Sequence, residues 1–261
     1  MQERRWTTLA DAERVHAMRD KPWVLRTENL EVRGTASLSQ LVEVANRLET
    51  FYGEIFASYA SFFAKDKSDV RLIFGLLDHD RLAVSGARNQ EDYRASLPSG
   101  IDAGWSAGMW IPSANSSFFF AGHQEVVYHE FTHQVLHAFS HVNNGPAWLV
   151  EGVAAYSQSP RFEHGAMRLG ILSEIRQVQC YFDQRAAGRA LSLEQLMAIA
   201  VTAAWSATTQ PDLTYAAAGA VVECCMEAAG RRYRADFIDF LRDSYLGRTM
   251  GHSLGLPGHQ P

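Results

Sequence analysis

The chain contains little cysteine and no long apolar run. Its three cysteines are Cys180 and the adjacent pair Cys224 and Cys225, among 261 residues. An odd number with two neighbours does not make a disulfide framework, and no Cys-x-x-Cys pattern suggests a thiolate metal site. No apolar run of about eighteen residues predicts a membrane-spanning helix, and no apolar stretch of signal-peptide length follows Met1. As written, the chain is expected to be cytoplasmic; a trimmed form of an exported protein would look the same.

An excess of basic residues is also missing. The formal net charge is -5, and the only tight basic cluster is Arg231, Arg232 and Arg234. Because Asp236 and Asp239 follow in a helical pattern, this cluster is typical of a solvated helix face. We therefore expect neither nucleic acid nor membrane as a partner. The apolar share of 47% and charged share of 20% are those of an ordinary globular protein.

Hydrophobic periodicity in the first half indicates a small sheet with one long helix. The expected elements are a strand at Val24–Val32, a helix at Leu38–Phe63, a strand at Val70–Leu77, a long polar connection at Asp78–Gly104, and a β-hairpin formed by Gly108–Pro112 and Ser116–Ala121. A helix follows at Gln124–Ser140, and Gly145 and Pro146 mark its end and the start of the next helix.

The second half is expected to be entirely helical. The predicted helices are Ala147–Ser157, Ala166–Ala187, Leu193–Trp205, Tyr215–Ala229 and Tyr233–Tyr245. Strands before the central helix and helices after it predict an α+β fold. We expect one domain in two lobes, with the sheet and the central helix at about 20–141, a helical lobe at about 142–248 and a tail at 249–261.

The central helix carries His129-Glu130-Phe131-Thr132-His133, an HExxH motif. A spacing of four residues is slightly more than one helical turn, so both imidazoles project from one face and can reach one metal ion. Glu130 lies one step round the helix, where it can reach a water molecule on that metal. The motif therefore predicts a hydrolytic metal centre.

A second helix is expected to bring a carboxylate to the two histidines. It begins at Pro146 after a tight turn, so it can run back beside the first helix, and it carries Glu151. Gly152, Ala154 and Ala155 are small enough to allow a neighbouring helix to approach closely.

The stretch Tyr128–Ser157 resembles the gluzincins, a group of metallopeptidases in the MA clan. The likeness consists of HExxH followed, after 17 intervening residues, by Glu-Gly-x-Ala-x-Tyr at Glu151–Tyr156. The Pro-x-Trp-Leu-x-Glu-Gly segment at Pro146–Gly152 is similar to that of compact bacterial peptidase-MA-like domains. About thirty residues match specifically, and the remainder only in outline. The resemblance implies a zincin-like fold.

The resemblance also implies roles for individual residues. His129, His133 and Glu151 would bind Zn²⁺, and Glu130 would be the general base. Tyr215 is the candidate donor to the developing oxyanion, and Tyr156 is the alternative; each could instead only pack. The substrate would be a peptide or protein, and no oligomeric state is indicated.

The strand before the motif helix stands where zincins keep an edge strand that pairs with extended substrate. Its candidate substrate-binding residues are Ser116, Ser117, Phe118, Phe119 and Phe120. The alternative is an ordinary interior strand with aromatic core residues.

Three features depart from related families. Gly108-Met109-Trp110 lacks the glutamate with which aminopeptidases grip the substrate's amino terminus, so endopeptidase action is favoured. Leu136 and Phe139 replace the glycine and third histidine of metzincins. His123, His137 and His141 are expected near the site or on the surface rather than as ligands.

Two other functions stay open. The chain could be a metal-bearing but inactive scaffold that binds a peptide or protein, or a metal-dependent hydrolase of a non-peptide amide or ester. Both use the same three ligands.

Overall fold

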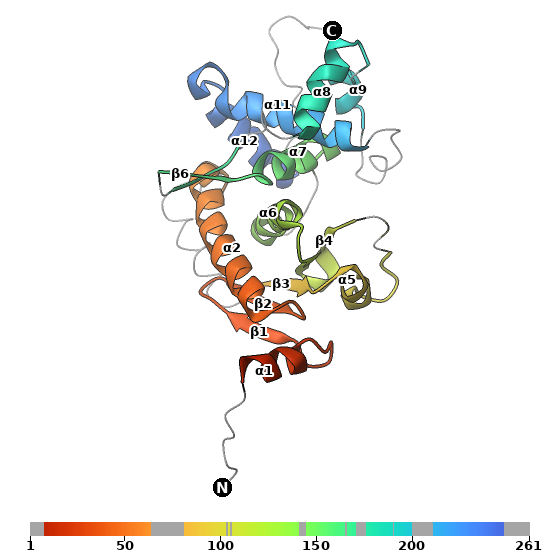
Figure 1. Cartoon of the computed structure of the whole chain (residues 1–261). Coiled ribbons are helices and arrows are strands. Elements are labelled where there is room, and N and C mark those ends of the chain that lie inside the picture. The colour runs from red at the N-terminus through yellow and green to blue at the C-terminus, as the bar shows by residue number, and fades with distance from the viewer. Residues whose placement is uncertain are drawn as a thin grey trace, which may run out of the picture. The chain divides into compact units, whose positions relative to one another are not determined.

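The structure is a computed structural model that describes residues 8–63, 81–102, 104, 106–140, 145–164, 166–170, 176–189, 191–199 and 211–247. The chain divides into two compact units (Figure 1). The first comprises Met1–Ile55 and Leu72–Val135, and the second comprises Phe56–Arg71 and Leu136–Pro261. The predicted α+β fold class is confirmed, with a mixed sheet in the N-terminal unit and helices dominating the C-terminal unit.

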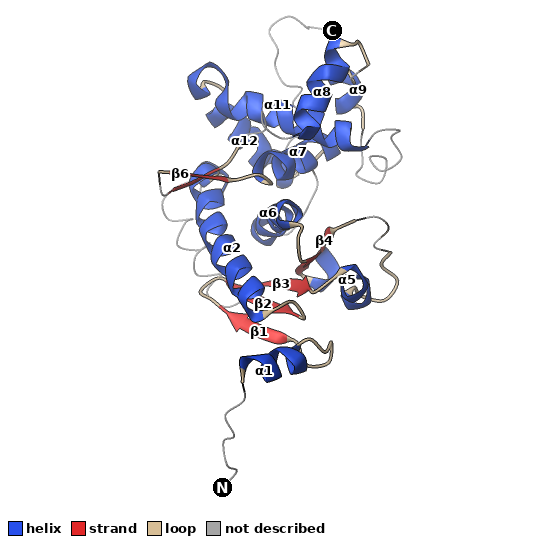
Figure 2. Ribbon diagram, in the orientation of Figure 1, coloured by secondary structure: helices blue, strands red, loops and turns tan. Residues whose placement is uncertain are grey.

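The N-terminal unit is built on a five-stranded mixed sheet with the order β1-β2-β3-β5-β4 (Figure 2). The strands are β1 (Trp23–Arg26), β2 (Leu30–Gly34), β3 (Leu82–Ala87), β4 (Gly108–Ile111) and β5 (Ser116–Phe120). The three central strands β2, β3 and β5 are parallel, and β1 and β4 are antiparallel edge strands. The short 3-10 helix η1 (Pro112–Ala114) joins β4 to β5.

Helices cover both faces of this sheet. They are α1 (Leu9–His16), α2 (Leu38–Ser58), α5 (Gln90–Ser96) and α6 (Gln124–Ser140). Of α2 the residues up to Ile55, and of α6 the residues up to Val135, belong to this unit. Successive side chains of β5 point to opposite faces. Ser117 bonds to α6, and Phe119 lies beside Leu41 of α2, whereas Phe118 packs against Tyr93 of α5. Helices α2 and α6 therefore lie on one face and α5 on the other.

The predicted connection at Asp78–Gly104 is wrong, because it contains the central strand β3 and helix α5. Strand β3 reads Leu-Ala-Val-Ser-Gly-Ala, in which only Leu82 and Val84 are large apolar residues and the other four are small. Its small residues follow from packing: a Cβ on Gly86 would lie 2.7 Å from the Leu41 side chain and 2.9 Å from that of Phe119. Packing against the surrounding helices and strands, rather than the strand propensity of its own residues, makes this segment a strand.

The other predictions for this unit have mixed outcomes. The hairpin is confirmed as β4 and β5, and the helix at Gln124–Ser140 is α6 with the same bounds. The single strand predicted at Val24–Val32 is two antiparallel strands, β1 and β2, joined by a turn at residues 27–29. The strand predicted at Val70–Leu77 lies outside the described residues.

The C-terminal unit is mainly helical. Its elements are α3 (Ala60–Phe63), α7 (Ala147–Ser157), β6 (Arg161–Glu163), β7 (Ala166–Arg168), α8 (Arg176–Ala186), α9 (Leu193–Met197), α11 (Pro211–Arg231) and α12 (Arg234–Tyr245). Every residue of α7 is buried, as expected of a helix that is apolar all round. The helix predicted at Ala147–Ser157 is confirmed with the same bounds.

The prediction that everything after Ala147 is helical is wrong at residues 161–168, and the helix predicted at Leu193–Trp205 ends at Met197. Residues 161–168 form the antiparallel hairpin of β6 and β7 instead of opening a helix at Ala166. His164 takes a φ of 51° before β7, and Gly170 takes 77° after it. A Cβ on Gly170 would lie 2.1 Å from the Tyr156 ring, so only glycine fits there. Residues 200–205 of the helix predicted at Leu193–Trp205 lie outside the described part.

Close approach of α7 and α11 depends on Gly152. A Cβ at this position would lie 2.8 Å from the Ala218 carbonyl oxygen and 2.9 Å from the Val222 side chain. Gly152→Ala is therefore expected to lower the free energy of unfolding by ~1–3 kcal/mol, measured by denaturant titration. Gly53→Ala is the matched control, since a Cβ at this exposed site in α2 meets nothing within 4 Å. It should raise stability by ~0.5–1 kcal/mol, and an equal effect of both changes would contradict this account of Gly152.

Across the described residues, no helix has the length and apolar character needed to cross a membrane.

Candidate metal centre

Two histidines of α6 place their ring nitrogens side by side. The Nε2 atoms of His129 and His133 are 3.2 Å apart, and each residue is 8% exposed. Two nitrogens bound to one tetrahedral zinc at ~2.0–2.1 Å would be separated by ~3.3 Å. The observed separation therefore suits a shared metal ion. It also suits a hydrogen bond between two neutral rings, so a third group must distinguish the two arrangements.

A buried amide sets the rotation of α6 about its axis. Gln134 is 0% exposed and accepts a hydrogen bond from the Ser117 hydroxyl at 2.9 Å. Its Nε2 atom donates to the carbonyl oxygens of Ala83 at 3.0 Å and Asn115 at 3.1 Å. These bonds satisfy a polar group that would be costly to bury unpaired. They hold α6 against β3 and β5. Because His133 directly precedes Gln134 in this helix, the direction of its side chain is fixed as well.

The carboxylate of Glu130 is held by the edge strand. Its Oε2 atom accepts a hydrogen bond of 2.6 Å from the backbone N–H of Trp110 in β4. A charged acceptor makes such a bond short and strong. Gly108 belongs to the same contact, since a Cβ there would lie 2.4 Å from Val126 and 3.5 Å from the Glu130 side chain. Glu130 is thus fixed between α6 and β4, with its Oε1 atom left for another proton donor.

The third group is Glu151 of α7. It is 5% exposed, a degree of burial that is uncommon for a carboxylate. One ligand atom from each of His129, His133 and Glu151 lies within 4.8 Å of the other two. Within the described ranges, this is the group of three or more His, Cys, Asp or Glu side chains that could hold a metal ion.

The donor set is one that a metal ion can bind. Two imidazole nitrogens and one carboxylate oxygen are the protein ligands of several catalytic zinc sites, which keep a fourth position open. A cation would also compensate the buried negative charge of Glu151. The three residues predicted as ligands thus lie close enough together to share a metal ion.

The two candidate tyrosines lie in different surroundings. The Tyr156 hydroxyl donates to Glu227 at 2.9 Å, and Glu227 also accepts from Arg231 at 2.9 Å. Burial raises the pKa of Tyr156, and the charge of Glu227 raises it further. The Tyr156 hydroxyl is therefore bound in a structural cluster with the ion pair of Glu227 and Arg231. Tyr215 is half-buried in α11, the helix that packs on α7 through Gly152.

The prediction that Ser116–Phe120 is an edge strand is wrong. Strand β5 pairs with β3 on one side and with β4 on the other, so both of its backbone edges are occupied. Ser117 and Phe119 point to the α2 and α6 face, and Phe118 belongs to the buried cluster around Tyr93. The alternative of an interior strand with core aromatics is the observed one. The edge position belongs to β4.

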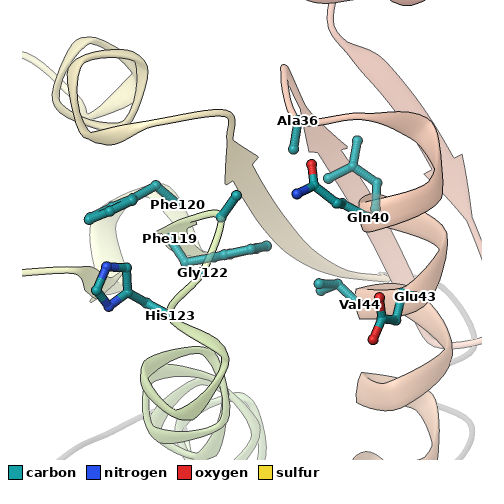
Figure 3. A pocket seen from close by; sticks show the side chains of 10 residues that line it. Ala36, Gln40, Glu43, Val44, Phe119, Phe120, Gly122 and His123 are labelled. Carbon is teal, nitrogen blue, oxygen red and sulfur yellow. The ribbon is translucent and has the colours of Figure 1, made fainter.

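His123 does not lie in the candidate metal centre. It is exposed, and its ring packs edge-on against Phe120 at 4.5 Å. Figure 3 shows it beside a pocket formed with Gln40 and Glu43 of α2. This pocket has a volume of about 50 Å³, far below the ~300–1,000 Å³ typical of small-molecule sites. His137 is half-buried on α6, and His141 lies outside the described residues.

Sequence reasoning missed the supports of the site. Trp110 contacts Glu130 through its backbone N–H, which no motif of side chains reveals. Gln134 lies within the apolar pattern of α6, so no sequence pattern indicated its role. Burial raises the pKa of Tyr93, and the Glu130 carboxylate raises it further. This effect places the two residues within electrostatic range of each other. The pairing of β4 with β5 brings the Trp110 N–H to the Glu130 carboxylate.

No family model matches the chain, and neither a curated protein nor a solved structure matches it significantly.

Proposed function

We propose that this protein is a zinc-dependent metallopeptidase that cleaves peptide bonds within peptide or protein chains. The observation that carries the proposal is the convergence of one ligand atom each from His129, His133 and Glu151 to within 4.8 Å. The presence of Glu130 beside the two histidines supports hydrolysis rather than storage of a metal, because structural zinc sites need no general base.

The chain's own residues would divide the chemistry as follows. His129, His133 and Glu151 would hold the zinc ion, which would lower the pKa of a bound water to about 7 and polarise the scissile carbonyl. Glu130 accepts the water proton at Oε1 and passes it to the leaving amine, while the Trp110 N–H keeps Oε2 in place. His129 and His133 would bind the metal through their Nε2 atoms, which already face each other. Low exposure of all three ligands excludes bulk water and strengthens these electrostatic interactions.

Strand β4 is the proposed site of substrate pairing. It is one of the two edge strands of the sheet, and an extended peptide can add to such an edge through backbone hydrogen bonds. Because Trp110 of the same strand contacts Glu130, a peptide added there would pass close to the general base. This proposal replaces the one for Ser116–Phe120.

Tyr215 is the proposed donor to the oxyanion. Loss of one such donor typically lowers kcat by ~10²–10³-fold, so Tyr215→Phe should have an effect of this order while metal content stays intact. Tyr233→Phe is the matched control, because Tyr233 is 47% exposed and lies just before α12. Kinetics on a cleavable peptide and metal analysis of the same samples measure both. Unchanged turnover in Tyr215→Phe would remove this residue from the mechanism.

Exposure of the protein to an unbiased peptide library tests the proposed function. Cleavage that is abolished by a chelator and restored by zinc supports the peptidase. Metal-dependent peptide binding without cleavage supports the inactive scaffold. Hydrolysis of model esters or acylated amines, with peptides left intact, supports the non-peptide hydrolase.

A further inference from the structure

The C-terminal unit contains a pocket that belongs to no part of the proposed metal centre. Its volume is about 790 Å³, within the ~300–1,000 Å³ of small-molecule sites. The pocket is lined by residues of α8, α9, α11 and the segment between α8 and α9: Phe182, Arg185, Gly188, Leu191, Ser192, Leu193, Leu196, Ala220, Val221, Cys224 and Cys225.

Different faces of α11 serve the pocket and α7. Ala218 and Val222 contact Gly152, the neighbour of Glu151, whereas Ala220, Val221 and Cys224 line the pocket. Neither histidine of the triad nor Glu151 is among the lining residues. Occupation of the pocket therefore requires no metal.

The lining is apolar, and its rim is exposed. Phe182 is 52% exposed and Leu193 is 51% exposed. Large apolar side chains gathered at the mouth of an apolar pocket are typical of a surface that a ligand covers. Of the two polar side chains in the lining, the Ser192 hydroxyl is already used as the N-terminal cap of α9.

Arg185 is the other polar group and the pocket's one charge. It is exposed, and within the described ranges no carboxylate lies at ion-pair distance from its guanidinium. A guanidinium binds a carboxylate through two parallel hydrogen bonds. One cation balances one carboxylate, whereas a phosphate dianion would leave negative charge beside an apolar surface.

We propose that this pocket binds a linear amphiphile with one carboxylate, namely a free fatty acid of medium chain length. The alkyl chain lies against Leu191, Leu196 and Val221, and the carboxylate pairs with Arg185 at the pocket mouth. Burial of the chain supplies most of the affinity, and the ion pair selects acids over alcohols and amines of equal length.

Binding of dodecanoate to the full chain, by isothermal titration below the micelle threshold, tests this proposal. Wild-type protein should bind one equivalent, with chelator present or absent. Arg185→Gln should weaken dodecanoate binding about tenfold and leave dodecanol binding within about twofold. Arg189→Gln removes a neighbouring charge that does not line the pocket and that bonds Gln184 instead, and it should have no effect. Equal affinity of Arg185→Gln and wild type would overturn the assignment of Arg185.

A filled pocket provides the second test. Ala220 is half-buried in the lining, and Ala220→Trp should occupy the space and weaken both dodecanoate and dodecanol at least tenfold. Circular dichroism and peptide cleavage verify that this variant is folded. Absence of saturable binding by wild type, or unchanged binding by a folded Ala220→Trp variant, would overturn the pocket itself. Neither result would bear on the metallopeptidase proposal, because the triad is unaltered in every variant used.

Discussion

Replacement of Glu130 by glutamine is expected to reduce peptide turnover by ~10²–10⁴-fold while the metal stays bound. Glutamine has nearly the same shape, and its carbonyl oxygen can still accept the Trp110 N–H that now bonds to Glu130 Oε2. It cannot, however, take a proton from water at neutral pH. Steady-state kinetics with metal analysis of the same preparation measure both quantities.

Glu125→Gln is the matched control for this change. Glu125 lies in the first turn of the same helix and is exposed, so the loss of its charge should leave turnover within about twofold. Thermal melts should be similar for wild type and both variants. Turnover of Glu130→Gln close to that of wild type would exclude Glu130 as the general base, whatever the metal content.

His133→Ala should abolish both metal binding and activity. Partners that only support a metal ligand cost ~10–100-fold in affinity when they are removed, so the loss of a ligand should exceed that range. The fall in affinity is measured by zinc titration against a competing chelator. Zinc should also raise the melting temperature of wild type, because it binds the folded state, and this rise should disappear in His133→Ala.

His123→Ala is the histidine control, since His123 is exposed and packs against Phe120. It should bind zinc as wild type does. If His123→Ala and His133→Ala weakened zinc equally, binding would reflect general histidine affinity and not the proposed centre.

The core of the site could be predicted because its determinants are local. Four residues of one helix bring His129 and His133 to one face, and this holds wherever the helix packs. Gly145 and Pro146 punctuate the chain between α6 and α7, and both helices have the predicted bounds. Glu151 lies on α7, so the prediction of that helix also placed the third candidate ligand.

Predictions failed where packing overrides local preference. Gly86 of β3 has no room for a side chain because Leu41 and Phe119 occupy the space beside it. With Ala83, Ser85 and Ala87 also small, the sequence of this strand resembles a loop. The order of strands in the chain does not reveal which strand is at the edge of the sheet. Strand β5 follows β4 in sequence, but it lies between β3 and β4 in the sheet. Strand order depends on contacts between distant segments, which periodicity does not report.

Tyr156 shows that a motif residue need not serve chemistry. It stands in the segment that resembles the gluzincins, and its hydroxyl bonds to Glu227 of α11 instead of facing a free space. The partner is 71 residues away in sequence, so no local pattern could reveal it. The motif identifies the helix, but tertiary contacts determine the role of each of its side chains.

The most direct test of the account is zinc X-ray absorption spectroscopy on the protein loaded with one equivalent of the metal. The account predicts only nitrogen and oxygen neighbours at ~2.0–2.2 Å, with the multiple scattering of two imidazoles, and the loss of this imidazole signal in His133→Ala, which no longer binds the metal. Sulfur neighbours at ~2.3 Å, or an unchanged spectrum in His133→Ala, would contradict it.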